Sequence, residues 1–155
     1  MKAMFCALLL LAVFSAKAQP TQVIIIRPLQ NFFLDDRVKV DDPHYCRVIS
    51  KRSDFIKTFG IAKTGTNKVE LPDFTKDNVI MLALPASEKD VYLTYTNAIK
   101  AGDFIEVYCK INKSRAPLTY TQQHVVLGII PKYTGLHTIR FYDQRRHLLK
   151  AVKVN

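Results

Sequence analysis

The residues best suited to chemistry in this sequence are a histidine and a cysteine two positions apart. His44 and Cys46 would share one face of a strand, because side chains in a strand alternate with a period of two. A neighbouring imidazole can accept the proton of a thiol and leave a nucleophilic thiolate. The pair defines one hypothesis, a small hydrolase or thiol enzyme, which ranks below the binding hypotheses that follow.

The same cysteine has a structural interpretation. Once an N-terminal signal is removed, the chain keeps two cysteines, Cys46 and Cys109. An exported chain can hold a disulfide, and an even number of cysteines permits one. Two buried thiols that pack as small apolar groups are the alternative. The sequence leaves both interpretations open.

Other catalytic and metal-binding patterns are missing from the sequence. It contains no Gly-rich phosphate loop, no HExxH, no CxxC and no GxSxG turn. The four histidines are scattered along the chain, without the local spacing of metal ligands. The acidic pairs Asp35–Asp36 and Asp41–Asp42 lack the alternating ligands of a calcium loop. We therefore expect a protein that is not an enzyme and that needs no cofactor or metal.

Positive charge gathers near the C-terminus of a chain whose formal net charge is +10. Between Lys132 and Lys153 the only acidic residue is Asp143. In an exported protein, such a surface would meet an anionic envelope polymer, membrane head groups or an acidic protein, rather than nucleic acid. A solvated face that keeps the protein soluble is the alternative. The candidate binding residues are Arg140, Tyr142, Arg145, Arg146, Lys150 and Lys153.

Residues 1–18 have the three parts of a secretory signal peptide. Lys2 supplies a positive start, Ala3–Phe14 is apolar, and Ala16 and Ala18 are the small residues that a signal peptidase recognises. The apolar run is shorter than the ~20 residues that span a bilayer. We predict cleavage near Ala18 and export to the periplasm, the cell envelope or the outside of the cell.

The mature chain is expected to contain an N-terminal strand and loop over 19–42 and one β-rich domain over 43–155. Ser50–Phe59 predicts a short helix, with Ser50 or Ser53 as its cap and Gly60 as its left-handed end. The continuous apolar run Val79–Leu84 predicts a strand that is covered on both faces.

Alternating residues and turn signals continue to a final hairpin around Asp143–Gln144, and 112–121 is expected to be a polar loop. The pattern predicts an α+β, β-rich fold, an antiparallel meander sheet of about seven strands with one short helix packed on a face.

Three stretches of the chain resemble a family of exported bacterial proteins similar to the C-terminal domain of PrcB, a subunit of a surface protease complex. These stretches are Ser50–Gly60, Pro72–Ile80 and Leu118–Thr121. The resemblance implies a non-catalytic accessory role, in which the protein stabilises or docks another exported protein such as a protease. The chain departs from the family at Ala86–Tyr92, which lacks the glycine-containing turn found there.

The leading hypothesis is therefore an exported binding module that acts through protein contact. Edge strands of its sheet could accept a strand of the partner. Four tyrosines are expected near such an edge: Tyr92, Tyr95, Tyr108 and Tyr120. The alternative is that the basic C-terminal hairpin binds an anionic envelope polymer or a membrane surface.

Overall fold

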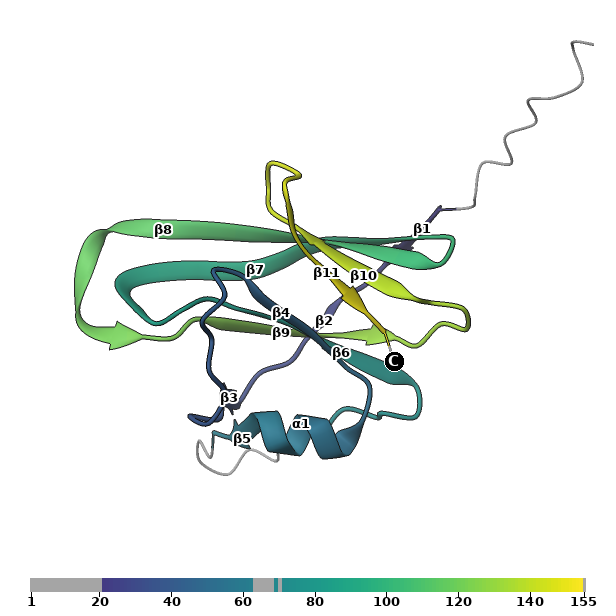
Figure 1. The fold of residues 1–155 in the computed structure, drawn as a ribbon, viewed down its shortest axis with the longest axis horizontal. Coiled ribbons are helices and arrows are strands. Elements are labelled where there is room, and N and C mark those ends of the chain that lie inside the picture. The colour runs from purple at the N-terminus through teal and green to yellow at the C-terminus, as the bar shows by residue number, and fades with distance from the viewer. Residues whose placement is uncertain (1–20, 63–68, 70, 155) are drawn as a thin grey trace, which may run out of the picture.

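Eleven strands and one helix make up the computed structural model over the residues that it describes, 21–62, 69 and 71–154 (Figure 1). The predicted β-rich α+β class with one short helix is confirmed. In chain order the elements are β1 (Thr21–Ile24), β2 (Arg27–Pro28), β3 (Phe32–Leu34), β4 (Tyr45–Ile49), α1 (Arg52–Thr58), β5 (Phe59–Ile61), β6 (Asp77–Ala83), β7 (Ser87–Ala101), β8 (Phe104–Gln122), β9 (Val125–Pro131), β10 (Thr138–Tyr142) and β11 (Leu148–Lys153).

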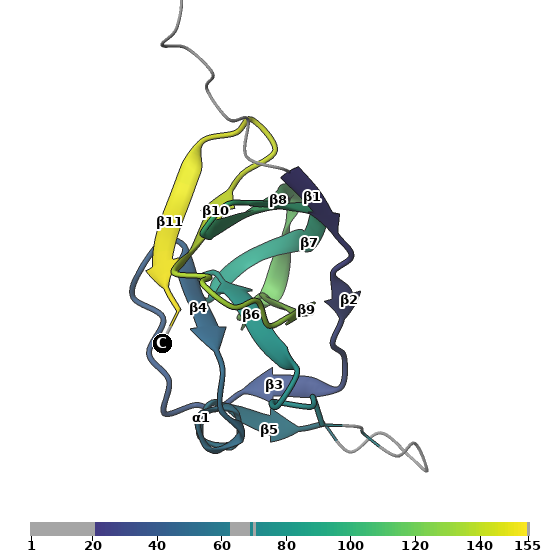
Figure 2. The ribbon, with the colours of Figure 1, turned by 90° about the vertical axis from the view of Figure 1, so that its right-hand side faces the viewer.

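The strands form three sheets rather than one meander. The five-stranded sheet has the order β1-β7-β8-β10-β11, the four-stranded sheet has the order β2-β9-β6-β4, and β3 pairs with β5. The two larger sheets pack face to face around one apolar core, with Ile105, Val107 and Phe141 from one sheet and Ile80 and Leu82 from the other. Figure 2 shows the two sheets as separate layers. Since β8 and β10 are parallel, the five-stranded sheet is mixed.

A long antiparallel ribbon connects the two larger sheets. β6 pairs with β9 in one sheet, and their continuations β7 and β8 pair in the other. The two strands of the ribbon stay hydrogen-bonded where they pass from one sheet to the other, because the Leu84 N–H donates to the His124 carbonyl at 2.9 Å. The expected loop over 112–121 belongs to β8. Between the pairs Val91–Lys113 and Ser87–Gln122, β8 has more residues than β7. The pairing of β8 with β7 is therefore irregular there, which explains why the sequence of this stretch predicted a loop.

A second core lies on the other face of the four-stranded sheet, under α1 and the β3–β5 pair. β6 is buried along its whole length between the two cores, as its apolar run predicts. In α1 the buried residues are Phe55 and Thr58, whereas Ile56 is 54% exposed. Packing of this face must stabilise α1, because a helix this short is not stable by itself.

Both ends of α1 differ from the expectation. The N-cap residue is Lys51, which makes no side-chain cap, and the Ser53 hydroxyl donates to Asp54 instead. Gly60 lies inside β5 rather than at a left-handed helix end. The reason for a glycine there is space, because a Cβ at Gly60 would lie 2.2 Å from Cζ of Phe33.

The segment 19–42 is part of the body where it is described, because β1 and β2 pair with β7 and β9. The expected signal peptide lies outside the described residues. Within the described residues, no helix is long and apolar enough to cross a membrane.

Candidate binding surface

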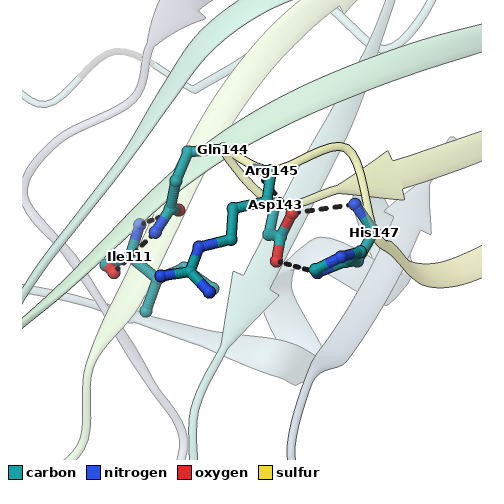
Figure 3. Close-up of polar contacts among 5 residues, drawn as sticks. All are labelled: Ile111, Asp143, Gln144, Arg145 and His147. Carbon is teal, nitrogen blue, oxygen red and sulfur yellow. Dashed lines mark hydrogen bonds and ion pairs between the residues drawn. The ribbon is translucent and has the colours of Figure 1, made fainter.

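The turn between β10 and β11 is organised by one carboxylate. Oδ1 of Asp143 accepts the backbone N–H groups of Arg145 and His147, each at 2.8 Å, and Oδ2 lies 3.1 Å from Nδ1 of His147 (Figure 3). Partial burial opposes the charge on Asp143, but the hydrogen bonds from His147 and Arg145 outweigh it and lower the pKa of the carboxyl. Asp143 therefore serves to hold the turn.

The side chain of Gln144 attaches this turn to β8. The Ile111 N–H donates to Oε1 of Gln144 at 3.1 Å, and Nε2 of Gln144 donates to the Ile111 carbonyl at 3.3 Å (Figure 3). A side-chain amide that hydrogen-bonds both the N–H and the carbonyl of one residue makes the same contacts as a neighbouring strand. The hairpin tip is thus fixed against β8, although 33 residues separate the two positions.

The six predicted binding residues lie at several places along the hairpin. Arg145 and Arg146 are exposed at the tip of the turn, where Arg146 adopts a φ of 64°. Lys150 is paired with Asp42 of the loop before β4, which raises the pKa of its ammonium group. The exposed Lys153 lies opposite Thr138 near the other end of the hairpin.

Arg140 and Tyr142 instead belong to the outer face of the five-stranded sheet. The alternating β8 residues Ile105 and Val107 are buried, so Phe104, Glu106 and Tyr108 lie on this outer face. The Arg140 guanidinium lies over the Phe104 ring, 4.0 Å from its centroid. The rings of Tyr108 and Tyr142 are stacked with centroids 5.5 Å apart. The pairing of β8 with β10 creates both contacts, because it sets Tyr142 beside Tyr108.

The tyrosine stack is further fixed by a carboxylate. The Tyr108 hydroxyl donates to Oε2 of Glu106 at 2.7 Å. This hydrogen bond, with some burial, raises the pKa of Tyr108, and the charge of Arg146 acts in the opposite direction. We name Phe104, Glu106, Tyr108, Arg140 and Tyr142 the outer-face cluster. No described helix or strand covers it, and Figure 1 shows only the β10–β11 turn rising above this sheet.

The predicted tyrosine group is divided by the structure. Tyr108 belongs to the outer-face cluster, whereas Tyr95 points into the molecule and donates its hydroxyl to the Val126 carbonyl at 3.2 Å. Tyr92 and Tyr120 are 62% and 57% exposed, on β7 and β8.

Both cysteines of the described chain lie in the core. Cys46 and Cys109 are free thiols, both buried in the core between the two larger sheets. Burial raises the pKa of Cys46 to about 12 and raises that of Cys109 as well. A buried thiol that keeps its proton at neutral pH is a poor nucleophile. Among the described residues, no three His, Cys, Asp or Glu side chains are close enough to bind a metal.

Phe104, Glu106 and Gln144 are the residues that sequence reasoning missed. The alternation of the strand after Gly102 already separates Phe104 and Glu106 from the buried positions. It does not show which strand lies beside them, because the parallel partner β10 is distant in the chain.

Comparison of the chain with protein-family models, with curated proteins and with solved structures gave no match.

Proposed function

We propose that this protein is an exported, non-catalytic accessory module that binds another exported protein, such as a protease, and stabilises it. The observation that carries the proposal is the outer-face cluster, in which aromatic rings and an arginine are ordered on a sheet face that no described element covers. Tyrosine and arginine are the residue types enriched where protein interfaces concentrate their binding energy. The resemblance to the C-terminal domain of PrcB supports the same role.

The cluster is suited to contact because it is ordered before a partner arrives. Stacking fixes Tyr142, and the bond to Glu106 fixes Tyr108, so little side-chain entropy remains to be lost on binding. The Arg140 guanidinium is stacked on Phe104, and none of the ion pairs among the described residues uses it, so its donors are available to a partner.

The test is a cross-linked capture from the native cell envelope with tagged mature protein, washed at low and at high salt. We expect one stoichiometric protein to survive the high-salt wash. The double variant Tyr108→Ser/Tyr142→Ser should lose it, and Tyr120→Ser, an exposed tyrosine outside the cluster, should retain it. If the double variant captures as much as the unchanged protein, this surface is not the binding surface.

A second candidate function is binding of an anionic envelope polymer or membrane surface by the basic hairpin. The observation that favours it is the Gln144–Ile111 contact, which fixes to β8 the turn that carries the exposed Arg145 and Arg146. Exposed charges are screened by salt, so this binding should weaken steeply as ionic strength rises. Sedimentation with anionic vesicles should decrease in Arg145→Ala/Arg146→Ala, and binding that is independent of salt would contradict this candidate.

A further inference from the structure

One side of the molecule is closed by the chain's own N-terminal segment. β1 adds to the edge of β7, with Val23 opposite Ile99, and β2 then adds to the edge of β9, with Arg27 opposite Ile129. One extended segment therefore joins the edges of both larger sheets. Figure 2 shows β1 and β2 following each other along this side.

The N-terminal segment turns away before it has covered the full length of the β7 and β9 edges. The Leu29 N–H still donates to the Leu127 carbonyl at 3.2 Å, but Asn31 has a φ of 66° and turns the chain away into β3. Asparagine adopts this left-handed conformation more readily than most residues. In the strand pairing of the described residues, Val91–Tyr95 has only β8 beside it and Val125 has only β6.

Two hollows lie along this side of the molecule. A hollow of about 140 Å³ lies between Thr94–Tyr95 and Val126–Leu127, and Ile26 and Pro28 of the N-terminal segment also line it. A second hollow of about 360 Å³ is lined by residues 91–93, by residues 122–125 and by Phe32–Leu34 of β3. On both stretches of chain its lining residues directly precede those of the smaller hollow, and we call the two hollows together the seam.

The residues that line the seam indicate which kind of ligand it can bind. None of the described residues that line it is Asp, Glu, Lys or Arg, so these residues supply no fixed charge with which to select an ion. The half-exposed rings of Phe33 and Tyr92 belong to the larger hollow. Gln123, from the same hollow, supplies amide donors and acceptors. This combination suits an uncharged ligand with hydrogen-bonding groups and an apolar side chain.

The edge of β9 also offers backbone groups. The Leu127 carbonyl faces away from β6, because it accepts the Leu29 N–H. Backbone groups alternate in direction along a strand, so those of Val125, two residues earlier, face the same way. An unpaired strand edge is a template for another strand, and peptides bind to proteins in this manner.

We infer that the seam binds an extended, uncharged peptide segment of a partner protein. The segment continues the line of β2 along β9, pairs with the backbone of Val125, and places a large apolar side chain against Phe33 and Tyr92. The inference rests on the proposed function of protein contact, but it uses a surface separate from the outer-face cluster.

The experiment compares two peptides by NMR titration of the ¹⁵N-labelled mature protein. The first is acetyl-Thr-Val-Tyr-Val-Thr-amide, and the second is the same peptide N-methylated at alternate residues. We expect the first to shift the amide signals of Val125, Gln123 and Leu93, and the second to bind at least about tenfold more weakly, because it lacks the backbone donors. No shift at Val125 up to millimolar peptide, or equal binding of both peptides, would overturn the inference.

Two matched variants complete the test. Tyr92→Ser should weaken binding of the first peptide several-fold, and Tyr120→Ser, a tyrosine of similar exposure outside the seam, should not. Equal effects of the two variants would count against the seam. If the peptide does not bind while envelope capture still depends on Tyr108 and Tyr142, only the inference is wrong. If the peptide does not bind and no envelope protein is captured, the proposed function is wrong as well.

Discussion

The side-chain amide of Gln144 pairs with the backbone of Ile111 as a strand residue would. Both backbone groups of Ile111 are used, with N–O distances of 3.1 and 3.3 Å (Figure 3). β10 itself accompanies β8 only as far as the pair Tyr142–Tyr108. Gln144 thus extends the sheet by one more pairing position, and it protects part of an edge that is otherwise available to other strands.

Replacing Gln144 by Ala should loosen the hairpin tip without unfolding the sheet. The two lost hydrogen bonds are partly solvated, so the free energy of unfolding should fall by about 0.5–1 kcal/mol. The sharper readout is hydrogen exchange of the Ile111 amide, which should become faster while the buried Val107 amide stays unchanged. Gln22→Ala is the matched control. Unchanged exchange at Ile111 would mean that the contact does not form in solution.

The Asp143 carboxyl should make the turn sensitive to acid. Its pKa is lowered from the ordinary value of 3.8 because, despite partial burial, it accepts hydrogen bonds from His147 and Arg145. A lowered pKa in the folded state means that the charged carboxylate stabilises the fold above the unfolded pKa. This contribution disappears as pH falls through the folded pKa. NMR titration of Asp143 should give a midpoint below 3.8, and a midpoint at or above that value would contradict the arrangement.

The two thiols should be inert in the folded protein. With its pKa raised to about 12 by burial, Cys46 carries almost no thiolate at pH 8. We expect iodoacetamide to label neither Cys46 nor Cys109 of the mature protein until it is unfolded, and then to add two groups without reductant. Rapid labelling of folded protein would revive the His44–Cys46 enzyme hypothesis. A disulfide, which the sequence also permits, would prevent labelling until the protein is reduced.

Features that depend on neighbouring residues were predictable from the sequence. The apolar run of β6 predicted its burial on both faces, and the alternation of the strand after Gly102 separates its buried positions from Phe104 and Glu106. The final hairpin was also recognisable, because its turn residues separate two segments in which apolar and polar residues are mixed. These patterns report burial along one strand, which local periodicity encodes.

Features that depend on distant pairing were not predictable in the same way. The parallel pairing of β10 with β8 places Arg140 and Tyr142 beside residues of β8, and the basic hairpin in the sequence gives no sign of this pairing. Gly60 was expected to end a helix, yet its role is to leave room for Phe33, a residue from another strand. A contact between remote segments leaves no local period that a single sequence can display.

Replacing Gly128 of β9 by Ala should reduce the stability of the fold more than the same replacement of Gly60 in β5. A Cβ at Gly128 would lie 2.5 Å from Cγ2 of Ile26 and 3.1 Å from the Tyr95 ring, so Gly128→Ala must displace the N-terminal segment or a hydrogen-bonded tyrosine. Overpacking of this kind costs about 1–3 kcal/mol.

Gly60→Ala is the matched comparison for this prediction. Its Cβ would meet the end of the Phe33 ring at 2.2 Å, but that side chain is half exposed and can rotate away. Chemical denaturation should therefore show a larger loss of stability for Gly128→Ala than for Gly60→Ala. Hydrogen exchange should also become faster at Leu29, whose N–H bonds β9 next to Gly128, in the Gly128 variant alone. The reverse order of the two losses would show that Ile26 does not pack against β9.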